Sequence, residues 1–174
     1  VFAPKNLKAD RLLYQNNYAN STLPNRSTKH FFSDSTSIIV NKKQPFLNGI
    51  DQSFSDLNIS VNENTNNIWL RANVQARFEK YLWNYSQFAT LVISFETATG
   101  QPITYRHVKL QNLIGNDTIL KANDLYGKPK TWDKVWLDVQ VPANIKADDV
   151  LKVYVHNPHQ NPIFIDDFEV HLLK

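Results

Sequence analysis

The 174-residue sequence has no cysteine, no methionine even at position 1, and only 4 glycines. Without cysteine there is no disulfide framework and no thiol nucleophile, although the redox compartment stays open. The missing initiator methionine favours a processed mature form or a segment of a longer polypeptide, with no signal peptide left in it. Because glycine is scarce, asparagine, aspartate, serine and threonine are expected to supply most turns.

Long apolar runs and dense charge runs are also missing. No stretch approaches the roughly 18–20 apolar residues of a membrane-spanning helix, so we expect no membrane insertion by this segment. Lysine and arginine number 19 against 16 acidic residues, which gives a formal net charge of +3. The basic residues occur as scattered pairs such as Lys42–Lys43, and this favours a solvated surface over a nucleic-acid interface.

Familiar catalytic motifs are absent as well. The sequence has no Gly-x-Ser-x-Gly elbow, no His-Glu-x-x-His motif and no P-loop. His156 and His159 are close in sequence, but Pro158 separates them at a strand end and no third ligand is near, so we interpret them as part of a polar turn. The sequence therefore predicts a protein that is not an enzyme.

Short strand-like runs recur along the chain, with turn signals between them and no helical periodicity. The clearest is 67–79, where aliphatic residues alternate with polar or aromatic ones, as in a half-buried antiparallel strand. Two sheets packed face to face would satisfy all of these patterns, so the sequence predicts an all-β antiparallel sandwich. The expected strands are 36–41, 54–61, 67–79, 89–97, 103–110, 132–141, 149–157 and 162–173.

The last expected strand places an acid among core side chains. Alternation assigns one face to Phe164, Asp166, Phe168, Val170 and Leu172, and the other face to Asp167, Glu169 and His171. A buried carboxylate is costly unless a cation or several N–H donors meet it. Asp166 therefore predicts either a structural ion or a hydrogen-bond cage, made by backbone N–H groups or by Arg26 or Lys29.

The outward faces of other strands carry residues suited to sugars. Aromatic rings offer flat apolar surfaces for sugar rings, and arginine and amide side chains can bond the hydroxyl groups. The candidate ligand contacts are Trp69, Arg71, Asn73, Trp136, Tyr154 and His156. Two alternatives stay open: the connections at 80–88 and 111–131 could cover these rings, or the rings could pack against a partner domain.

Several motifs follow one another along the chain, at 30–40, 44–50, 89–96, 132–135, 151–157 and 163–168. Their order resembles that of the galactose-binding-domain-like jelly rolls, the fold of many carbohydrate-binding modules. The most similar versions are appended to the C-termini of bacterial membrane or cell-surface proteins. The resemblance covers residues 12–174, and it implies jelly-roll topology for the predicted sandwich.

The resemblance also implies an organisation and a location. Residues 1–25 would be an N-terminal tether or extension, and residues 26–174 the sandwich. The protein would be an accessory ectodomain of an exported or membrane-tethered bacterial protein, in the periplasm or at the cell surface. Its partner would be a glycan or a neighbouring domain of the same polypeptide.

A structural calcium ion is a further implication of the resemblance. In the family, the closing acid often binds calcium together with an acid on the first strand. Asp166 matches the closing acid, but residues 13–17 offer only amides in place of the second acid. Calcium prefers six to eight oxygen ligands with charge supplied by carboxylates, so calcium at Asp166 is an alternative rather than a requirement.

Two competing functions remain open at this point. A lyase-type, polysaccharide-cleaving enzyme would need a tyrosine or histidine base with a neutralising arginine and an asparagine. Its candidate residues are Arg71, Asn73, Tyr105 and His107. The other competitor is a purely structural spacer.

Overall fold

The computed structural model describes residues 3–4, 6–61, 67–80, 82, 84–115 and 129–174. Its elements are β1 (Ala9–Asn16), β2 (Arg26–Ser27), β3 (Ser37–Val40), β4 (Phe46–Ser53), β5 (Trp69–Phe78), the 3₁₀ helix η2 (Tyr85–Gln87), β6 (Thr90–Glu96), β7 (Pro102–Lys109), β8 (Asp133–Gln140), β9 (Val150–His156) and β10 (Ile163–Leu173). No helix in this part of the chain is long and apolar enough to cross a membrane.

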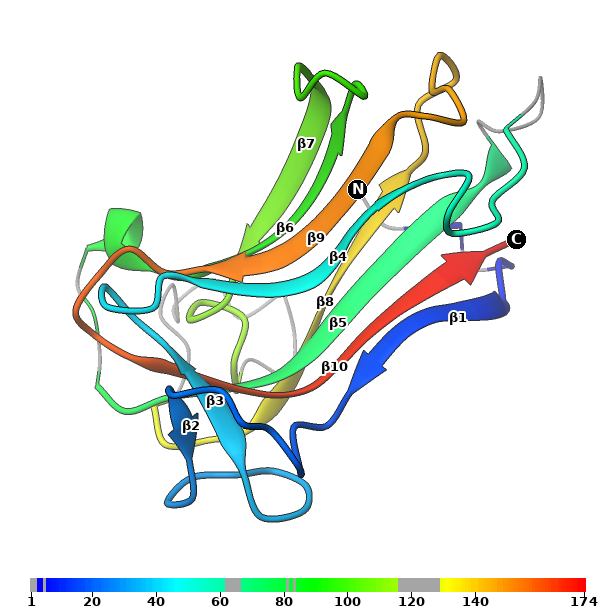
Figure 1. Ribbon diagram of the computed structural model, residues 1–174. Coiled ribbons are helices and arrows are strands. Elements are labelled where there is room, and N and C mark those ends of the chain that lie inside the picture. The colour runs from blue at the N-terminus through cyan, green and yellow to red at the C-terminus, as the bar shows by residue number, and fades with distance from the viewer. Residues whose placement is uncertain (1–2, 5, 62–66, 81, 83, 116–128) are drawn as a thin grey trace.

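Two antiparallel sheets pack face to face (Figure 1). The six-stranded sheet has the order β2-β3-β10-β5-β8, with β1 paired to the second half of β10. The four-stranded sheet has the order β4-β9-β6-β7. The predicted all-β antiparallel sandwich with jelly-roll topology is therefore confirmed.

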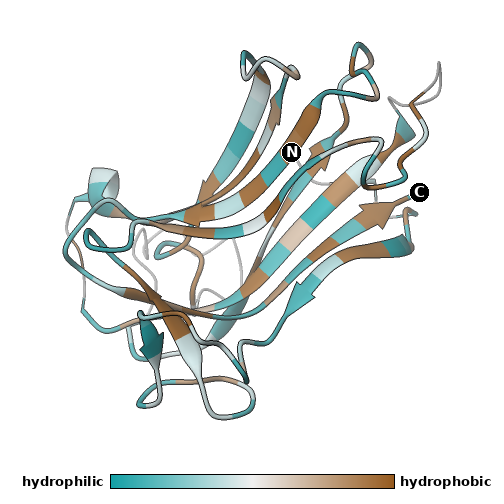
Figure 2. Ribbon diagram, viewed as in Figure 1, coloured by the Kyte–Doolittle hydropathy of each residue, from teal (hydrophilic) through white to brown (hydrophobic). Residues whose placement is uncertain are grey.

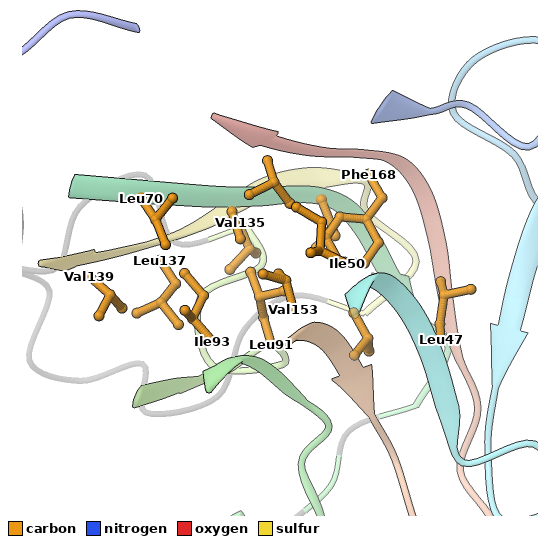
Figure 3. Packing of buried hydrophobic residues seen from close by; sticks show 14 of the residues in the cluster. Leu47, Ile50, Leu70, Leu91, Ile93, Val135, Leu137, Val139, Val153 and Phe168 are labelled. Carbon is orange, nitrogen blue, oxygen red and sulfur yellow. The ribbon is translucent and has the colours of Figure 1, made fainter. Parts of the chain in front are cut away.

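Alternate side chains of each strand fill the space between the sheets. Hydrophobic and hydrophilic residues alternate along the ribbons (Figure 2), and aliphatic side chains of the two sheets point toward one another (Figure 3). Leu70 of one sheet and Leu91, Ile93 and Val153 of the other have no solvent exposure. Burying one such side chain stabilises the fold by about 1.5–3 kcal/mol. This core fixes which side chains of every strand must face outward.

The closing strand β10 contains a β-bulge that alternation did not predict. Asp166 pairs with Gln75 and Glu169 with Asn73, so residues 167 and 168 oppose a single residue of β5. Asp167 takes up the extra length with a φ of +44°. Side chains therefore change faces at the bulge: Phe164 and Asp166 point outward, while Phe168, Val170 and Leu172 point into the core. The expectation that all five share one face is wrong for Phe164 and Asp166.

Two segments of the chain differ from the predicted organisation. The strand expected at 54–61 is wrong, because residues 54–58 form turns and the preceding residues 46–53 form β4. Within the expected N-terminal extension, β1 pairs with residues 168–173 of β10. A boundary at residue 25 therefore does not separate an extension from the sandwich. The half-exposed, polar character of β1 explains why its sequence gives only a weak strand signal.

Gly49 lets the Phe168 ring lie directly against β4. A Cβ atom at position 49 would lie 2.9 Å from Phe168 Cζ and 3.2 Å from the carbonyl oxygen of Val153. Because Phe168 is fully buried and the oxygen belongs to the backbone, we expect Gly49→Ala to lower the free energy of unfolding by about 1–3 kcal/mol. Chemical denaturation measures this loss. The exposed neighbour is the control: Asn48→Ala should change stability by less than about 0.5 kcal/mol, and equal stability of the two variants would contradict the crowding.

Candidate functional site

The predicted site residues lie on opposite sides of the sandwich. Strand pairing and burial place Trp69, Arg71, Asn73 and Trp136 on the outer face of the six-stranded sheet, and Tyr154 and His156 on the outer face of the four-stranded sheet. The prediction that Trp69, Arg71, Trp136 and Tyr154 form one recognition face is therefore wrong. The two outer faces have to be judged separately.

On the six-stranded sheet, most of the predicted residues belong to internal structure. Trp69 is 9% exposed and Asn73 is 3% exposed. The Arg71 Nε and Nη2 groups donate to the two carboxylate oxygens of Asp138 at 2.7 and 2.8 Å. The Asp138 side chain is only 1% exposed, so the Arg71 guanidinium serves as the counter-ion of a buried carboxylate.

A second polar network on the same face surrounds Glu169. Its carboxylate lies 3.2 Å from His171 Nε2 and 3.6 Å from Lys134 Nζ, and the Gln15 amide donates to it at 3.4 Å. Burial raises the pKa of Glu169, but the hydrogen bond with His171 and the Lys134 charge outweigh burial, and the pKa falls below its usual value. These polar groups are therefore already paired with one another.

Trp136 is the predicted aromatic residue that this face still offers to a ligand. Its side chain is 44% exposed and borders a cavity of about 330 Å³, also lined by Leu7, Lys134 and His171. An exposed ring beside apolar side chains suits a protein surface at least as well as a sugar.

The outer face of the four-stranded sheet arranges its side chains in cross-strand rows. Across β4, β9, β6 and β7 the rows are Phe46–His156–Thr90–Lys109, Asn48–Tyr154–Val92–His107 and Asp51–Lys152–Ser94–Tyr105. These residues are called the platform below. Neighbouring strands lie about 4.8 Å apart, so each row places its side chains within reach of one ligand.

Aromatic rings stand on both sides of the platform. Phe46 is 54% exposed and Tyr105 is 56% exposed. The Phe46 ring stacks on the His156 ring at 4.5 Å between centroids and meets Tyr154 edge-on at 5.8 Å. Across the sheet, Tyr105 lies parallel to His107 at 5.9 Å. The platform therefore offers flat apolar surfaces on β4, β7 and β9.

Shorter side chains lie between these rings, along β6. Val92 and Ser94 point outward, yet each is 6% exposed. Larger neighbours flank them, with Tyr154 on β9 and Tyr105 on β7. An extended ligand lying over β6 would thus have aromatic rings along both sides.

The platform also carries charge and hydrogen-bonding groups. Lys152 Nζ lies 2.7 Å from the Glu96 carboxylate at the end of β6. Burial, and next the Glu96 charge, raise the pKa of Tyr154. Burial, and next the charges of His159 and Lys109, lower the pKa of His156. At neutral pH the platform therefore presents an uncharged phenol and an uncharged imidazole beside an ion pair.

The lyase-type constellation is contradicted by strand positions. Arg71 and Asn73 lie on β5, on the outer face of one sheet, and Tyr105 and His107 lie on β7, on the outer face of the other. A base and a neutralising arginine on opposite sides of the sandwich cannot act on one substrate atom. Sequence reasoning did not include Phe46 in the site, and it considered Tyr105 and His107 only for this enzyme.

Asp166 is enclosed by N–H donors. Its side chain is fully buried, and its oxygens accept hydrogen bonds from the backbone N–H groups of Phe32, Ser33 and Asp167 at 2.9, 3.1 and 2.9 Å. Burial raises the pKa of Asp166, and these hydrogen bonds act in the opposite direction. The hydrogen-bond cage is therefore the correct alternative, with backbone donors instead of Arg26 or Lys29.

The contacts that the structure shows on the Asp166 carboxylate are N–H donors rather than further oxygen ligands. The neighbouring acid, Asp167, accepts a hydrogen bond from Ser33 Oγ at 2.7 Å. Within the described ranges, no group of three or more His, Cys, Asp or Glu side chains gathers to hold a metal ion.

Part of the connections expected to cover the aromatic residues, at 81, 83 and 116–128, lies outside the described residues.

No family model matches the sequence, and no curated protein sequence matches it.

The chain is similar to several solved structures. The CBM22-1 xylan-binding domain of Paenibacillus barcinonensis Xyn10C is 11% identical, with 96% of this chain and 97% of that chain covered and a TM-score of 0.52. The C-terminal family 22 carbohydrate-binding module of Clostridium thermocellum Xyn10B is 14% identical over 92% of each chain, with a TM-score of 0.48. The resemblance expected from the sequence is therefore confirmed at the level of fold: the chain is a jelly roll of the kind found in carbohydrate-binding modules.

Proposed function

We propose that the protein is a non-catalytic module that binds a glycan on the platform. The supporting observation is that exposed aromatic rings and polar side chains share one continuous sheet face. Sugars present C–H faces that pack on aromatic rings and hydroxyl groups that need hydrogen-bond partners. Tyr105 and Phe46 would supply the rings, and Asn48, Asp51 and Tyr154 the polar partners.

The dimensions of the platform suit an oligosaccharide. The seven residues of β6 span about 20 Å at about 3.3 Å per residue, which exceeds the length of a single sugar. Because a domain of the same fold is named as xylan-binding, a xylo-oligosaccharide is the first ligand to test. We place this module outside the cytoplasm, as an accessory domain of a larger exported protein.

A second candidate function uses the opposite face. Trp136 and Leu12 are 44% and 47% exposed on the outer side of the six-stranded sheet. Together with the neighbouring cavity, they suit docking of another domain of the same polypeptide. This role is compatible with glycan binding on the platform, since the two faces are on opposite sides.

We expect Tyr105→Ala to weaken binding of a soluble xylo-oligosaccharide about tenfold, because loss of one stacking ring removes about 1.4 kcal/mol. The substitution should leave the melting temperature unchanged, since Tyr105 is more exposed than buried. Isothermal titration calorimetry measures the affinity of the wild type and of the variant.

The matched control is Trp136→Ala, which removes an exposed ring from the other face. It should keep the wild-type affinity. Loss of binding in Trp136→Ala alone would move the site to the six-stranded sheet, and failure of every glycan in a broad panel to bind would defeat the proposal. Release of unsaturated sugar ends from uronate polymers would contradict the non-catalytic assignment.

A further inference from the structure

One end of the platform is formed by four chain segments that hydrogen bonds tie together. The Lys42 N–H donates to the carbonyl oxygen of His159 at 2.7 Å, and His159 Nε2 lies 3.2 Å from the carbonyl oxygen of Ser86. Lys109 Nζ donates to the carbonyl oxygen of Phe88 at 3.2 Å. Segments 40–47, 84–90, 107–111 and 156–161 therefore meet at this end, where β9 finishes.

Three of these four segments, 40–47, 107–111 and 156–161, carry basic residues. They contain no aspartate and no glutamate, and their basic residues are Lys42, Lys43, His107, Lys109, His156 and His159. The whole chain is nearly balanced, with 19 lysines and arginines against 16 acids, so this separation of charge is local. At the other end of the same strands, Asp51 and Glu96 lie beside Lys152. The platform is therefore electrostatically polarised along its strands.

Lys109 is a partly buried cation at this end of the platform. Its ammonium lies 5.7 Å from the centre of the Tyr85 ring, and burial lowers its pKa. Within the described part of the chain, no carboxylate lies at ion-pair distance from Lys109. A partly desolvated ammonium gains stabilisation when an anion approaches it.

Lys109 and His156 stand on either side of Thr90 in one row. Two interstrand spacings separate them, about 9.6 Å. An anionic group above Thr90 would lie between the two side chains, with the Phe46 ring beside it on the His156 side.

We propose that the platform selects anionic glycans, and that a carboxylate or sulfate group on the sugar binds between Lys109 and His156. This inference rests on the proposed glycan-binding function and names the class of ligand. Uronate residues and sulfated sugars share the required negative charge, so the experiment has to separate them.

Binding should strengthen as the pH falls. The titratable groups near His156 are Lys109 on β7, His159 in the following turn and Tyr154 on the same strand. The flanking residues Phe46 and Thr90 are uncharged. Burial, followed by the two positive neighbours, keeps the pKa of His156 below its usual 6.5. An anion held beside the imidazole favours its protonated form, so affinity for the anion rises as His156 becomes protonated.

The test is titration of the intact protein with matched ligands: a neutral xylo-oligosaccharide, the same chain carrying glucuronate, and a sulfated oligosaccharide of similar length. We expect an anionic ligand to bind at least about tenfold more tightly at low salt, with the advantage shrinking at high salt. Lys109→Gln should remove most of this advantage, so that the anionic ligand binds about as tightly as the neutral one. Lys146→Gln removes the same charge near the opposite end, before β9, and should change neither ligand.

The outcomes separate the two proposals. Tighter binding of the glucuronate ligand or of the sulfated ligand supports the inference and identifies the anion. Equal affinity for neutral and anionic ligands, at any salt or pH, overturns the inference and leaves glycan binding intact. No binding of any ligand overturns both. If the melting temperature of Lys109→Gln shows that it is unfolded, His156→Gln provides the same comparison.

Discussion

Asp166→Ala should lower the free energy of unfolding by about 3–5 kcal/mol at neutral pH. The substitution removes the acceptor for the N–H groups of Phe32, Ser33 and Asp167. The first two belong to the segment that covers the outer face of β10, so their loss detaches this segment from the sheet. Equilibrium denaturation with urea, followed by tryptophan fluorescence, measures the change.

Two milder variants test whether the hydrogen bonds are responsible. Asp166→Asn keeps one oxygen acceptor and should lose about half as much stability as Asp166→Ala. Asp167→Asn should cost about 1 kcal/mol or less, because its side chain accepts one hydrogen bond from Ser33 and asparagine tolerates a positive φ. If Asp166→Ala were as stable as Asp167→Asn, the cage would have no structural importance.

Chelator and pH provide independent checks on Asp166. Because N–H donors occupy its oxygens, a chelator should leave the melting temperature unchanged, and a drop would restore the calcium alternative. Burial raises the folded-state pKa above the usual 3.8, so folding favours the protonated acid. The contribution of Asp166 is then fully present below pH 3.8 and declines as the pH rises through the folded-state value. The stability advantage of the wild type over Asp166→Asn should therefore be larger at acidic than at neutral pH.

Alternation in the sequence was enough to predict the sandwich, because the core imposes it on most strands. Leu70 and Val74 of β5, and Val135 of β8, are buried as predicted. The pattern failed where buried apolar residues do not form a strand. Phe54, Leu57 and Ile59 belong to the core, yet residues 54–58 form turns. Buried apolar residues in and after a turn therefore gave 54–61 the sequence pattern of a strand.

The bulge in β10 could not be predicted for a related reason. A single extra residue at Asp167 reverses the faces of the side chains on one side of it. The sequence still showed that Asp166 needs a partner, since a carboxylate in an apolar strand has few solutions. It could not show that the partner is a loop on the outer side.

The candidate site was harder to predict than the fold. Alternation shows whether a side chain faces the core or the outside, but not which of two sheets it belongs to. That assignment depends on pairing between segments far apart in sequence, such as Asn73 with Trp136 and Tyr154 with Val92. Tyr154 was therefore grouped with Arg71, which lies on the other side of the molecule. The period-2 pattern of 103–110 already indicated that Tyr105, His107 and Lys109 face the same side of their strand.

Arg71→Ala should destabilise the protein by about 2–4 kcal/mol and leave glycan affinity unchanged. Without Arg71, the Asp138 carboxylate keeps the Ala3 N–H at 3.1 Å but loses its counter-ion and two charge-assisted hydrogen bonds. The platform lies on the opposite side of the sandwich, so the glycan affinity should not change. Urea denaturation measures the free energy of unfolding, and calorimetric titration of the same sample measures the glycan affinity.

Single and double replacements separate the pair from its individual residues. Asp138→Ala should cost less than Arg71→Ala, because a half-exposed guanidinium can be hydrated whereas a buried carboxylate cannot. Replacing both residues, as Arg71→Met with Asp138→Leu, should recover most of the loss, since an apolar residue of similar size suits the buried position of Asp138 and no unpaired carboxylate remains. The opposite result is equally informative. If Arg71→Ala kept its stability but lost glycan affinity, the six-stranded sheet would be the binding face and the platform proposal would be wrong.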